Sequence, residues 1–282
     1  MPKLLSAAAL QSYRDDGFHF PLDILSAGEA SDLRARLERF EAGEGKPLSG
    51  GMRHKAHLLF TWLNDLVHHP RILDAVEDVL GPDLFCWSST FFIKEARDPG
   101  FVSWHQDATY WGLSSPDVIT AWVAFTPATI ESGAMRMVPG SHRTQHAHHE
   151  TWNKDNLLSR GQEVQVDIDD HGAVDIVLQP GQASLHHVLI VHGSEPNRSD
   201  DRRIGFALRY IPTHLHQTVP GPRDSATLVR GVDRYHHFDH EPAPDRDLSE
   251  KAWATHRDAA ERSAAILYAG TRTESFENVV RS

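Results

Sequence analysis

The middle of the chain, from about residue 84 to residue 213, is a succession of short segments rich in β-branched and aromatic residues. Gly, Pro, Asp or Ser bound these segments, which include LFCWSSTFFIKEA, VITAWVAFTPA, AMRMVPGS, VDIVLQPGQ, ASLHHVLIVHG and RRIGFALRYIP. Several short strands at close spacing are typical of a sandwich or barrel. The sequence therefore predicts a β core over about 84–213.

Helices are expected on both sides of this core. Ser26 and Glu29 have the spacing of a capping box, in which each side chain bonds the other's backbone amide, and Gly43 is a plausible end for that helix. A second helix fits HPRILDAVEDVLGP and ends at Gly81. A third fits SEKAWATHRDAAERSAAILYAG near the C-terminus. We expect one domain over residues 1–282, mainly β with helical flanks.

One long segment, from about 142 to 172, breaks the strand pattern. Its sequence is polar and contains the histidine-rich stretch HAHHE. Unbroken loops of this length inside a compact domain are usually functional or disordered. We expect this segment to be a mobile lid over the mouth of the core.

The charge balance limits the partners. The 28 Lys and Arg residues are outnumbered by 39 Asp and Glu residues, which gives a formal net charge of −11. Nucleic acids and anionic membranes both require a basic face, so neither is expected as a partner. An anionic small molecule needs only a local basic pocket and remains compatible with this charge. We expect a small-molecule substrate, and the sequence does not indicate an oligomeric state.

A reducing compartment, the cytoplasm, is expected from the cysteine content. Cys86 is the only cysteine, so the chain can form neither an internal disulfide nor a cysteine-based zinc site. The first residues, MPKLLSAAALQSYRDDG, are too soon interrupted by charges for a secretory signal. No apolar run approaches the roughly 20 residues needed to span a bilayer.

The stretch SWHQDATYW places His105 and Asp107 two positions apart. On a strand, side chains at i and i+2 point to the same face, so this pair could bind one metal ion. The tripeptide alone is weak evidence, because the chain has 20 histidines and short motifs match often by chance. The interpretation needs a third ligand.

His192 supplies the third candidate ligand, near the end of the segment ASLHHVLIVHGSEPN. Two histidines and a carboxylate suit a non-haem Fe(II) facial triad, which leaves positions open for 2-oxoglutarate and O2. Arg203 lies eleven residues beyond His192, and its planar guanidinium suits the far carboxylate of 2-oxoglutarate. Ser194 is placed to add a hydroxyl hydrogen bond. If the segment were one strand, His186 would lie roughly 20 Å from His192, too far to reach the same ion.

These motifs together resemble the phytanoyl-CoA dioxygenase family of Fe(II)/2-oxoglutarate-dependent oxygenases. The family pattern is His-x-Asp, a distal His followed by Gly-Ser, and an Arg eleven residues beyond that His; WHQD and HHVLIVHGSEPNRSDDRR contain all of it. YRDDGFHFPLDILSAGEASDLRARLERF and MVPGSH also resemble the family, so the likeness runs from Tyr13 to about Pro212. It implies a double-stranded β-helix, a jelly-roll or cupin-like core whose mouth holds the iron.

The resemblance also bears on the reaction. Halogenases that resemble these hydroxylases carry Ala or Gly where this chain has Asp107, so the resemblance favours oxygenation. It implies Fe(II)- and 2-oxoglutarate-dependent hydroxylation of an unactivated C–H bond of a small polar metabolite, with release of succinate and CO2. The same cofactors also support desaturation, cyclisation or epoxidation. A non-catalytic β-barrel metabolite-binding protein and a cupin-like hydrolase or isomerase with another metal are the other readings.

Four further residues are candidates for the pocket. Tyr110 and Trp111 suit a substrate pocket as well as a β core. Arg209 falls on the same strand face as Arg203, where it would meet an acidic substrate group or pair with a core carboxylate. The resemblance makes Lys55 a candidate near 2-oxoglutarate or substrate, although an exposed position is the default for a lysine.

Overall fold

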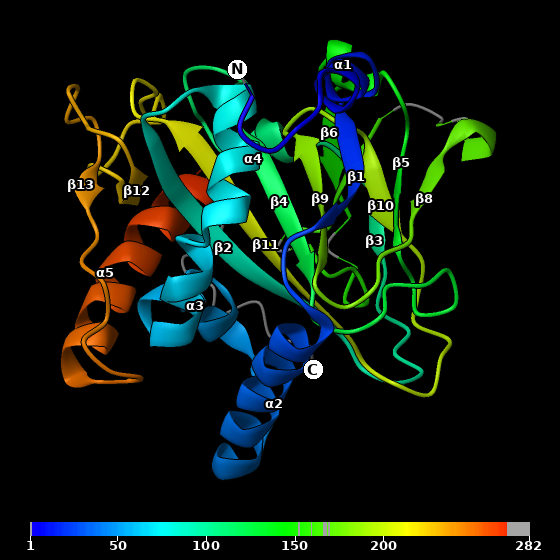
Figure 1. Cartoon of the computed structure of the whole chain (residues 1–282), viewed down its shortest axis with the longest axis horizontal. Helices are drawn as coiled ribbons and strands as arrows, with labels where there is room; N and C mark the ends of the chain where they lie inside the picture. Colours follow the sequence, from blue (N-terminus) through cyan, green and yellow to red (C-terminus); the bar gives the residue numbers. More distant parts are fainter. Residues whose placement is uncertain (1, 152, 159, 166–167, 169, 270–282) are drawn as a thin grey trace.

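The computed structural model describes residues 2–151, 153–158, 160–165, 168 and 170–269. Most of its strands form two antiparallel sheets (Figure 1). The larger sheet has the order β1 (Phe18–Asp23), β9 (Gln182–His187), β4 (Ile119–Ala124), β11 (Arg203–Pro212), β2 (Leu84–Lys94), β12 (Ser225–Arg230) and β13 (Asp239–His240), with only β12 and β13 parallel. The smaller sheet has the order β3 (Val102–His105), β10 (His192–Ser194), β5 (Met135–Met137) and β8 (Val174–Ile176).

The two sheets pack face to face through a buried apolar cluster. Trp122 and Ala207 come from the larger sheet, and Met137 and Ile176 from the smaller one. Gly205 lies beneath Trp122, because a Cβ at this position would stand 1.8 Å from the indole ring. The prediction of a mainly β chain with flanking helices is confirmed, and two facing antiparallel sheets are the arrangement of a double-stranded β-helix.

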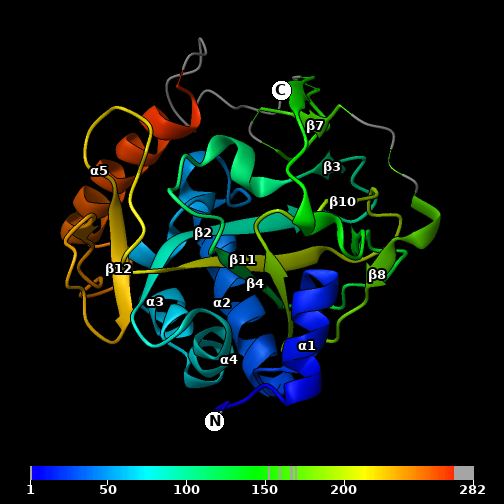
Figure 2. The same ribbon diagram turned by 90° about the horizontal axis from the view of Figure 1, so that it is seen from above.

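Helices cover the outer face of the larger sheet. Leu37, Leu63 and Val76 from three helices join Phe206 and Leu208 of β11 in one buried cluster. Figure 2 shows α1 (Ala7–Asp16), α2 (Ala27–Glu44), α3 (Thr61–Val67) and α4 (Pro70–Leu80) on one side of β2 and β11, with β3 and β10 on the other side. Helix α5 (Glu250–Leu267) does not belong to this layer and lies beside β12. Short 3-10 helices are η1 (Gly50–Arg53), η2 (Ala56–Leu58), η3 (Asp107–Tyr110), η4 (Ser141–Arg143) and η5 (Asp170–Gly172).

The predicted helices are present, with one changed boundary. The Ser26 hydroxyl accepts from the Glu29 amide, and the Glu29 carboxylate accepts from the Ser26 amide, which is the predicted capping box. This helix continues through Gly43 and ends where Gly45 takes a left-handed conformation, φ 67°. Helix α5 starts after its cap Ser249, whereas Gly270, the end of the third predicted segment, lies outside the described residues. Helices α1 and α3 and strands β12 and β13 were not predicted.

The segment 142–172 contains secondary structure and is not an unbroken loop. It contains the hairpin of β6 (His148–Glu150) and β7 (Gln162–Val164), together with η5 and most of η4. Residues 152, 159, 166–167 and 169 of the predicted lid lie outside the described residues. The segment thus has some secondary structure of its own, outside the two main sheets, and its action as a lid stays a prediction.

The segment ASLHHVLIVHG forms two strands and not one. Strand β9 ends at His187 in the larger sheet, and a bond from the Ile190 amide to the His187 carbonyl closes a turn. The chain then enters the smaller sheet as β10 at His192. Within the described part of the chain, no helix has the length and apolarity needed to cross a membrane.

Candidate active site

Three buried side chains meet at the edge between β3 and β10. These strands are antiparallel, with His105 directly opposite His192. Asp107 follows as the first residue of η3, so the turn and not the strand carries the carboxylate. One candidate ligand atom from each residue lies within 4.8 Å of the others, and this is the one such cluster found among the described residues. Gly193 permits the close approach of the strands, since a Cβ there would lie 2.9 Å from the Val102 carbonyl oxygen.

Backbone carbonyls fix the orientation of both imidazoles. The Nδ1 of His105 donates to the Ser103 carbonyl at 2.9 Å, and the Nδ1 of His192 donates to the Ile190 carbonyl at 3.0 Å. Each ring therefore carries its proton on Nδ1 and presents an unprotonated Nε2 to the cluster, as a metal ligand requires. The His105 Nε2 lies 3.3 Å from Asp107 Oδ1.

The segment between the first two ligands is anchored by a buried amide. Gln106 donates from Nε2 to the carbonyls of Thr144 and Leu189, and its Oε1 accepts from the His146 amide. The Gln106 backbone amide donates to Nε2 of His148 at 2.8 Å. This network holds the turn that presents Asp107, and sequence reasoning had assigned no role to Gln106 or His148.

The electrostatics of the cluster favour a cation. Burial opposes ionisation of Asp107, but the adjacent His105 imidazole and the positive charge of nearby Arg209 outweigh it and hold the pKa of this carboxyl well below its usual range. Burial and the neighbouring His105 lower the pKa of His192 to about 4. At neutral pH the cluster therefore offers the neutral imidazole of His192 and the carboxylate of Asp107 beside the Nε2 of His105, which suits a divalent metal such as iron.

A small cavity between the sheets adjoins the three ligands. Arg203 is 1% exposed, donates to the Gly133 carbonyl and lies 5.4 Å from the Trp122 ring. Burial lowers its pKa to about 10, so it remains charged at neutral pH. Ser194 accepts from the ammonium of Lys94 at 2.8 Å, a buried cation that the sequence had not suggested for this region. The remaining polar residues of the lining are Thr120, His186, Ser194, Arg203 and Arg209.

Four residues of this lining have a buried polar atom that finds no hydrogen-bond partner among the described residues: Thr120 Oγ1, His186 Nδ1, Arg203 Nε and Arg209 Nε. Buried polar groups are normally paired, so their gathering around one cavity indicates a polar ligand. Hydroxyl, imidazole and guanidinium groups are all donors to carboxylate and keto oxygens. The residues present therefore fit 2-oxoglutarate.

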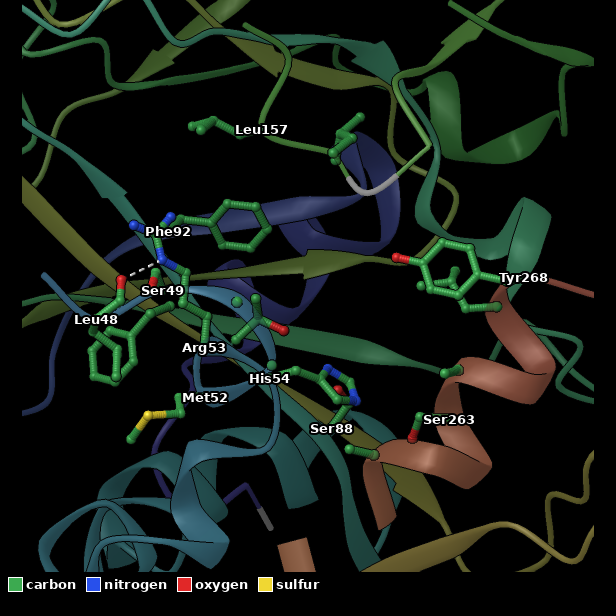
Figure 3. Close-up of a pocket in the computed structure, with 18 of the residues that line it drawn as sticks. Leu48, Ser49, Met52, Arg53, His54, Ser88, Phe92, Leu157, Ser263 and Tyr268 are labelled. Atoms are coloured by element: carbon green, nitrogen blue, oxygen red, sulfur yellow. Dashed lines mark hydrogen bonds between the residues drawn. The ribbon is translucent and has the colours of Figure 1, made fainter. Parts of the chain in front are cut away.

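A second, larger cavity of about 1440 Å³ opens next to the first, and the two share Phe92, Asp107 and Arg209 in their linings. Tyr110 and Trp111 line the larger one. Figure 3 shows it bounded by the segment from Leu48 to His54, by Phe92 and Leu157, and by α5 with Ser263 and Tyr268. It extends from the candidate metal ligands to the C-terminal helix.

Arg209 lies between the two cavities. Its Nη1 donates to the Thr90 hydroxyl at 2.8 Å, and its guanidinium lies 5.0 Å from the Trp111 ring. Among the described residues no carboxylate forms an ion pair with it, although Asp107 is near enough to favour its charge. The structure thus places Arg209 facing open space rather than against a core carboxylate.

The prediction that Lys55 lies near 2-oxoglutarate or substrate is wrong. It lines neither of the two cavities; its ammonium donates to the Ser225 carbonyl and pairs with Glu241, and all three groups are buried. Residue 55 enters η2 in the left-handed conformation, φ 48°, where its amide bonds the Ser89 carbonyl. The sequence contains no signal that would associate Lys55 with Glu241, 186 positions away.

Comparison with known proteins agrees with this geometry. Residues 13–205 match the family model for phytanoyl-CoA dioxygenase. A probable alpha-ketoglutarate-dependent hypophosphite dioxygenase of Stutzerimonas stutzeri is 30% identical over 194 residues, 66% of each chain. The solved structure of the non-heme monooxygenase ThoJ is 36% identical, covers 92% of this chain and 97% of its own, and has a TM-score of 0.81. CytC3 with Fe(II) and alpha-ketoglutarate is 25% identical, with coverage of 87% and 96% and a TM-score of 0.66.

The family model covers more than half of the chain, which confirms the resemblance seen in the sequence and the cupin-like core. The chain belongs to the phytanoyl-CoA dioxygenase family of Fe(II)/2-oxoglutarate-dependent oxygenases.

Proposed function

We propose that this enzyme hydroxylates an unactivated C–H bond of a small molecule, with Fe(II), 2-oxoglutarate and O2 as cofactor and co-substrates. His105, Asp107 and His192 would hold the iron, and Arg203 and Ser194 would hold the far carboxylate of 2-oxoglutarate. The observation that carries this proposal is the meeting of two Nε2 atoms and one carboxylate beside the buried Arg203, at the inner end of a large cavity.

The bound cofactors would supply the oxidising chemistry, with 2-oxoglutarate leaving as succinate and CO2. The chain supplies orientation and exclusion of water. The carbonyls of Ser103 and Ile190 keep both imidazoles in the ligating tautomer. Arg203 supplies the charge that a buried carboxylate requires. Trp122 and Phe92 line the apolar part of the small cavity.

We propose that the substrate is a small polar metabolite that binds in the larger cavity, in contact with Tyr110, Trp111 and Arg209. Arg209 lies where an acidic substrate group would find an unpaired guanidinium. Among the relatives described above, the hypophosphite dioxygenase is the one whose name states a substrate, and that substrate is not transferred to this chain.

Hydroxylation is preferred to desaturation, cyclisation or epoxidation as the simplest outcome of the same site. A non-catalytic binding protein has no use for three ligands that leave metal positions open. A cupin-like hydrolase or isomerase has no need of an arginine beside the site for a dicarboxylate co-substrate.

The β core and both helical flanks are proposed to act as one domain over 1–282, because α5 and η1 both line the larger cavity. The single cysteine leads us to propose a reducing, cytoplasmic setting. Nucleic acids and membranes are not proposed as partners.

The test combines metal analysis with a metabolite-library screen that measures substrate-stimulated succinate release. Stoichiometric Fe(II) and succinate formation that a library member stimulates, with one hydroxyl added to that compound, are expected. Turnover with Zn²⁺ and without 2-oxoglutarate would instead support the hydrolase or isomerase reading. Binding of metabolites with no succinate formation at any of them would support the binding protein.

A further inference from the structure

The volume of the larger cavity is greater than an amino-acid-sized metabolite would fill. Its volume of about 1440 Å³ compares with roughly 300–1,000 Å³ for pockets that hold drug-sized ligands. One wall is α5, whose lining residues include Trp253, Ala260, Ala264 and Leu267. This helix lies beyond residue 205, where the family match ends. The wall formed by α5 therefore comes from the part of the chain that follows the family match.

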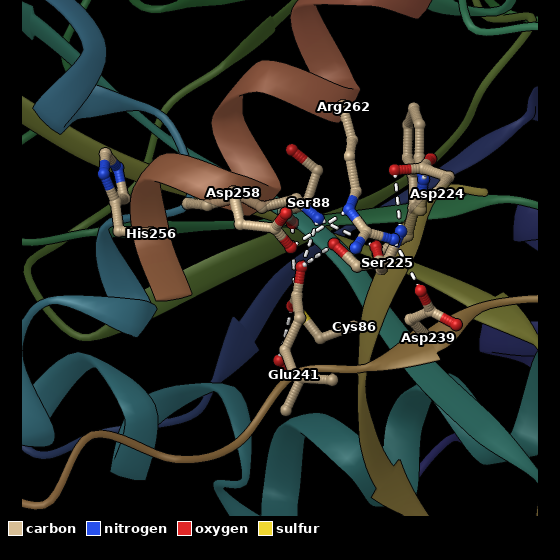
Figure 4. A network of polar contacts seen from close by, with 12 residues as sticks. Cys86, Ser88, Asp224, Ser225, Asp239, Glu241, His256, Asp258 and Arg262 are labelled. Carbon is tan, nitrogen blue, oxygen red and sulfur yellow. Dashed lines mark hydrogen bonds and ion pairs between the residues drawn. The ribbon is translucent and has the colours of Figure 1, made fainter. Parts of the chain in front are cut away.

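Three sets of contacts fix α5 in this position. The His256 imidazole bonds the His54 carbonyl at 2.8 Å. Arg262 donates to the Arg223 carbonyl and pairs with Asp239 (Figure 4). At the other end, Arg160 donates to the Leu267 carbonyl at 2.8 Å. The cavity is thus enclosed by a helix held in place by polar contacts.

The charge of the lining is opposite to that of the chain. The lining contains five cationic side chains and three carboxylates, and one of these carboxylates, Asp107, is a candidate metal ligand. The whole chain, by contrast, has 28 Lys and Arg against 39 Asp and Glu. The cationic residues are Lys46, Arg53, Lys154, Arg209 and Arg257. Arg209 is the buried member, and it lacks a carboxylate partner among the described residues.

The space between Arg209 and α5 has apolar walls. Leu48, Met52 and Leu157 lie opposite the apolar residues of α5 (Figure 3). An occupant would therefore present an anionic group at the inner end and apolar surface along the cavity. We propose that the substrate is an acidic amphipathic molecule, longer than an amino-acid-sized metabolite, whose acidic group pairs with Arg209 and whose apolar body extends along α5. This inference rests on the proposed function and replaces its small polar metabolite.

Binding of simple probes tests the proposal. Linear carboxylates from hexanoate to dodecanoate and the matching primary amides are titrated calorimetrically, without oxygen, into protein loaded with Fe(II) and 2-oxoglutarate. Affinity should rise roughly fourfold for each added methylene, because burial of a methylene contributes about 0.8 kcal/mol. Each acid should bind at least about tenfold more tightly than its amide, because it forms a charge-assisted bidentate pair with the guanidinium.

Variants show which residues cause the dependence on chain length and which cause the preference for acids. Arg209→Gln should remove the difference between acid and amide and keep the dependence on chain length. Ala264→Trp, which fills the cavity from α5, should remove the dependence on length and keep the preference for acids; Ala260→Leu should do so more weakly. Ala254→Trp, on the exposed side of the same helix, should bind every probe as the wild type does.

Iron and 2-oxoglutarate binding are measured first in every variant, by the metal-to-ligand charge-transfer band. If the wild type binds both and none of the acids, the inference is overturned and the proposed function stands. Equal binding of acids and amides also overturns it, as does loss of 2-oxoglutarate binding in Arg209→Gln with the acid preference unchanged. If the wild type binds neither iron nor 2-oxoglutarate, the proposed function fails independently of how the probes bind.

Discussion

The imidazole rings of His186 and His192 lie with their centroids 5.2 Å apart, although the chain changes sheets between them. His186 is the last residue but one of β9, and His192 is the first of β10. A straight strand would separate them by roughly 20 Å. The turn after His187 instead brings His186 into the lining of the small cavity, where its Nδ1 has no hydrogen-bond partner in the part of the chain that the structure describes.

His186 should therefore contribute to co-substrate binding. We expect His186→Phe, which keeps the ring and removes both nitrogens, to raise the dissociation constant of 2-oxoglutarate by about tenfold or more. The reason is the loss of a hydrogen bond to a charged group, worth roughly 1.5–3 kcal/mol. Anaerobic titration of the Fe(II) protein, followed by the charge-transfer band, measures this. His214→Phe, at an exposed histidine, is the control. An unchanged constant and band in His186→Phe would assign His186 to packing alone.

Replacement of the three proposed iron ligands should impair the iron site and leave the fold intact. His105→Ala and His192→Ala should lose most Fe(II) binding and activity, and Asp107→Ala should abolish hydroxylation. Far-UV circular dichroism should not change, because the strands that carry the ligands also pair with each other and with β5. Iron content after anaerobic reconstitution is the measurement, with the exposed His149→Ala as control. Full turnover by either histidine variant would show that the ligands are wrongly assigned.

Local sequence was sufficient to predict the candidate metal ligands and insufficient to predict their surroundings. Short motifs predicted His105, Asp107 and His192, which the structure brings together, and alternation along the segment RRIGFALRYIP placed Arg203 and Arg209 on one face, as observed. The position of His186 depends on a turn inside a continuous apolar run, which resembles one strand. Gln106 with His148, and Lys94 with Ser194, are contacts between distant segments that no local pattern encodes.

The neighbouring residues Arg203 and Arg202 should have different phenotypes. Arg203→Ala should raise the apparent 2-oxoglutarate constant by roughly two to three orders of magnitude, since an unpaired buried charge costs about 3–5 kcal/mol. Arg203→Lys should do less harm, because it keeps the charge and loses the planar fork. Arg202 pairs with Glu41 and Glu95, so Arg202→Ala should lower stability and leave 2-oxoglutarate binding unchanged. The reverse pattern in the anaerobic titration would reassign the co-substrate site.

The buried Lys55–Glu241 pair should matter for stability. Glu241 also accepts from the hydroxyls of Ser225 (Figure 4) and Thr227. Burial opposes its charge, but Lys55 and His57 outweigh burial and hold the pKa of Glu241 well below its usual range. Lys55→Met leaves this carboxylate without its cation and should lower the free energy of unfolding by about 3–5 kcal/mol at pH 7, measured by urea denaturation.

The pH dependence of that loss has a definite sign. A carboxyl with a depressed pKa in the folded state stabilises above its unfolded pKa of about 4.3, and this contribution disappears as the pH falls. In Lys55→Met the cation is gone, so Glu241 can protonate more readily and relieve the cost. The difference between wild type and variant should therefore narrow as the pH falls from 7 toward about 4. A difference that is constant over this range, or one no larger than in the exposed Lys46→Met, would contradict a stabilising pair.

The segment 142–172 is predicted to act as a lid, and Arg160 is the contact that should hold it. Its guanidinium lies 4.2 Å from the Tyr110 ring, pairs with Glu150 and donates to the Leu267 carbonyl. Arg160 thus joins the segment to η3, which carries Asp107, and to the last turn of α5. Nearby Leu157, Leu158 and Gln162 line the larger cavity, so a ligand there would contact the same segment.

Two changes in proteolysis should follow from this arrangement. Saturation of the Fe(II) protein with 2-oxoglutarate and a substrate found by the library screen should slow cleavage within 142–172, because the bound ligand adds contacts to a segment that must open for the protease. Arg160→Ala should speed cleavage there and reduce the protection, whereas Arg97→Ala, which removes an exposed pair with Asp200, should change neither. Mass spectrometry of timed digests locates the cuts. Cleavage within the segment that is the same with and without ligands, in wild type and in Arg160→Ala, would make it a fixed wall of the cavity instead of a lid.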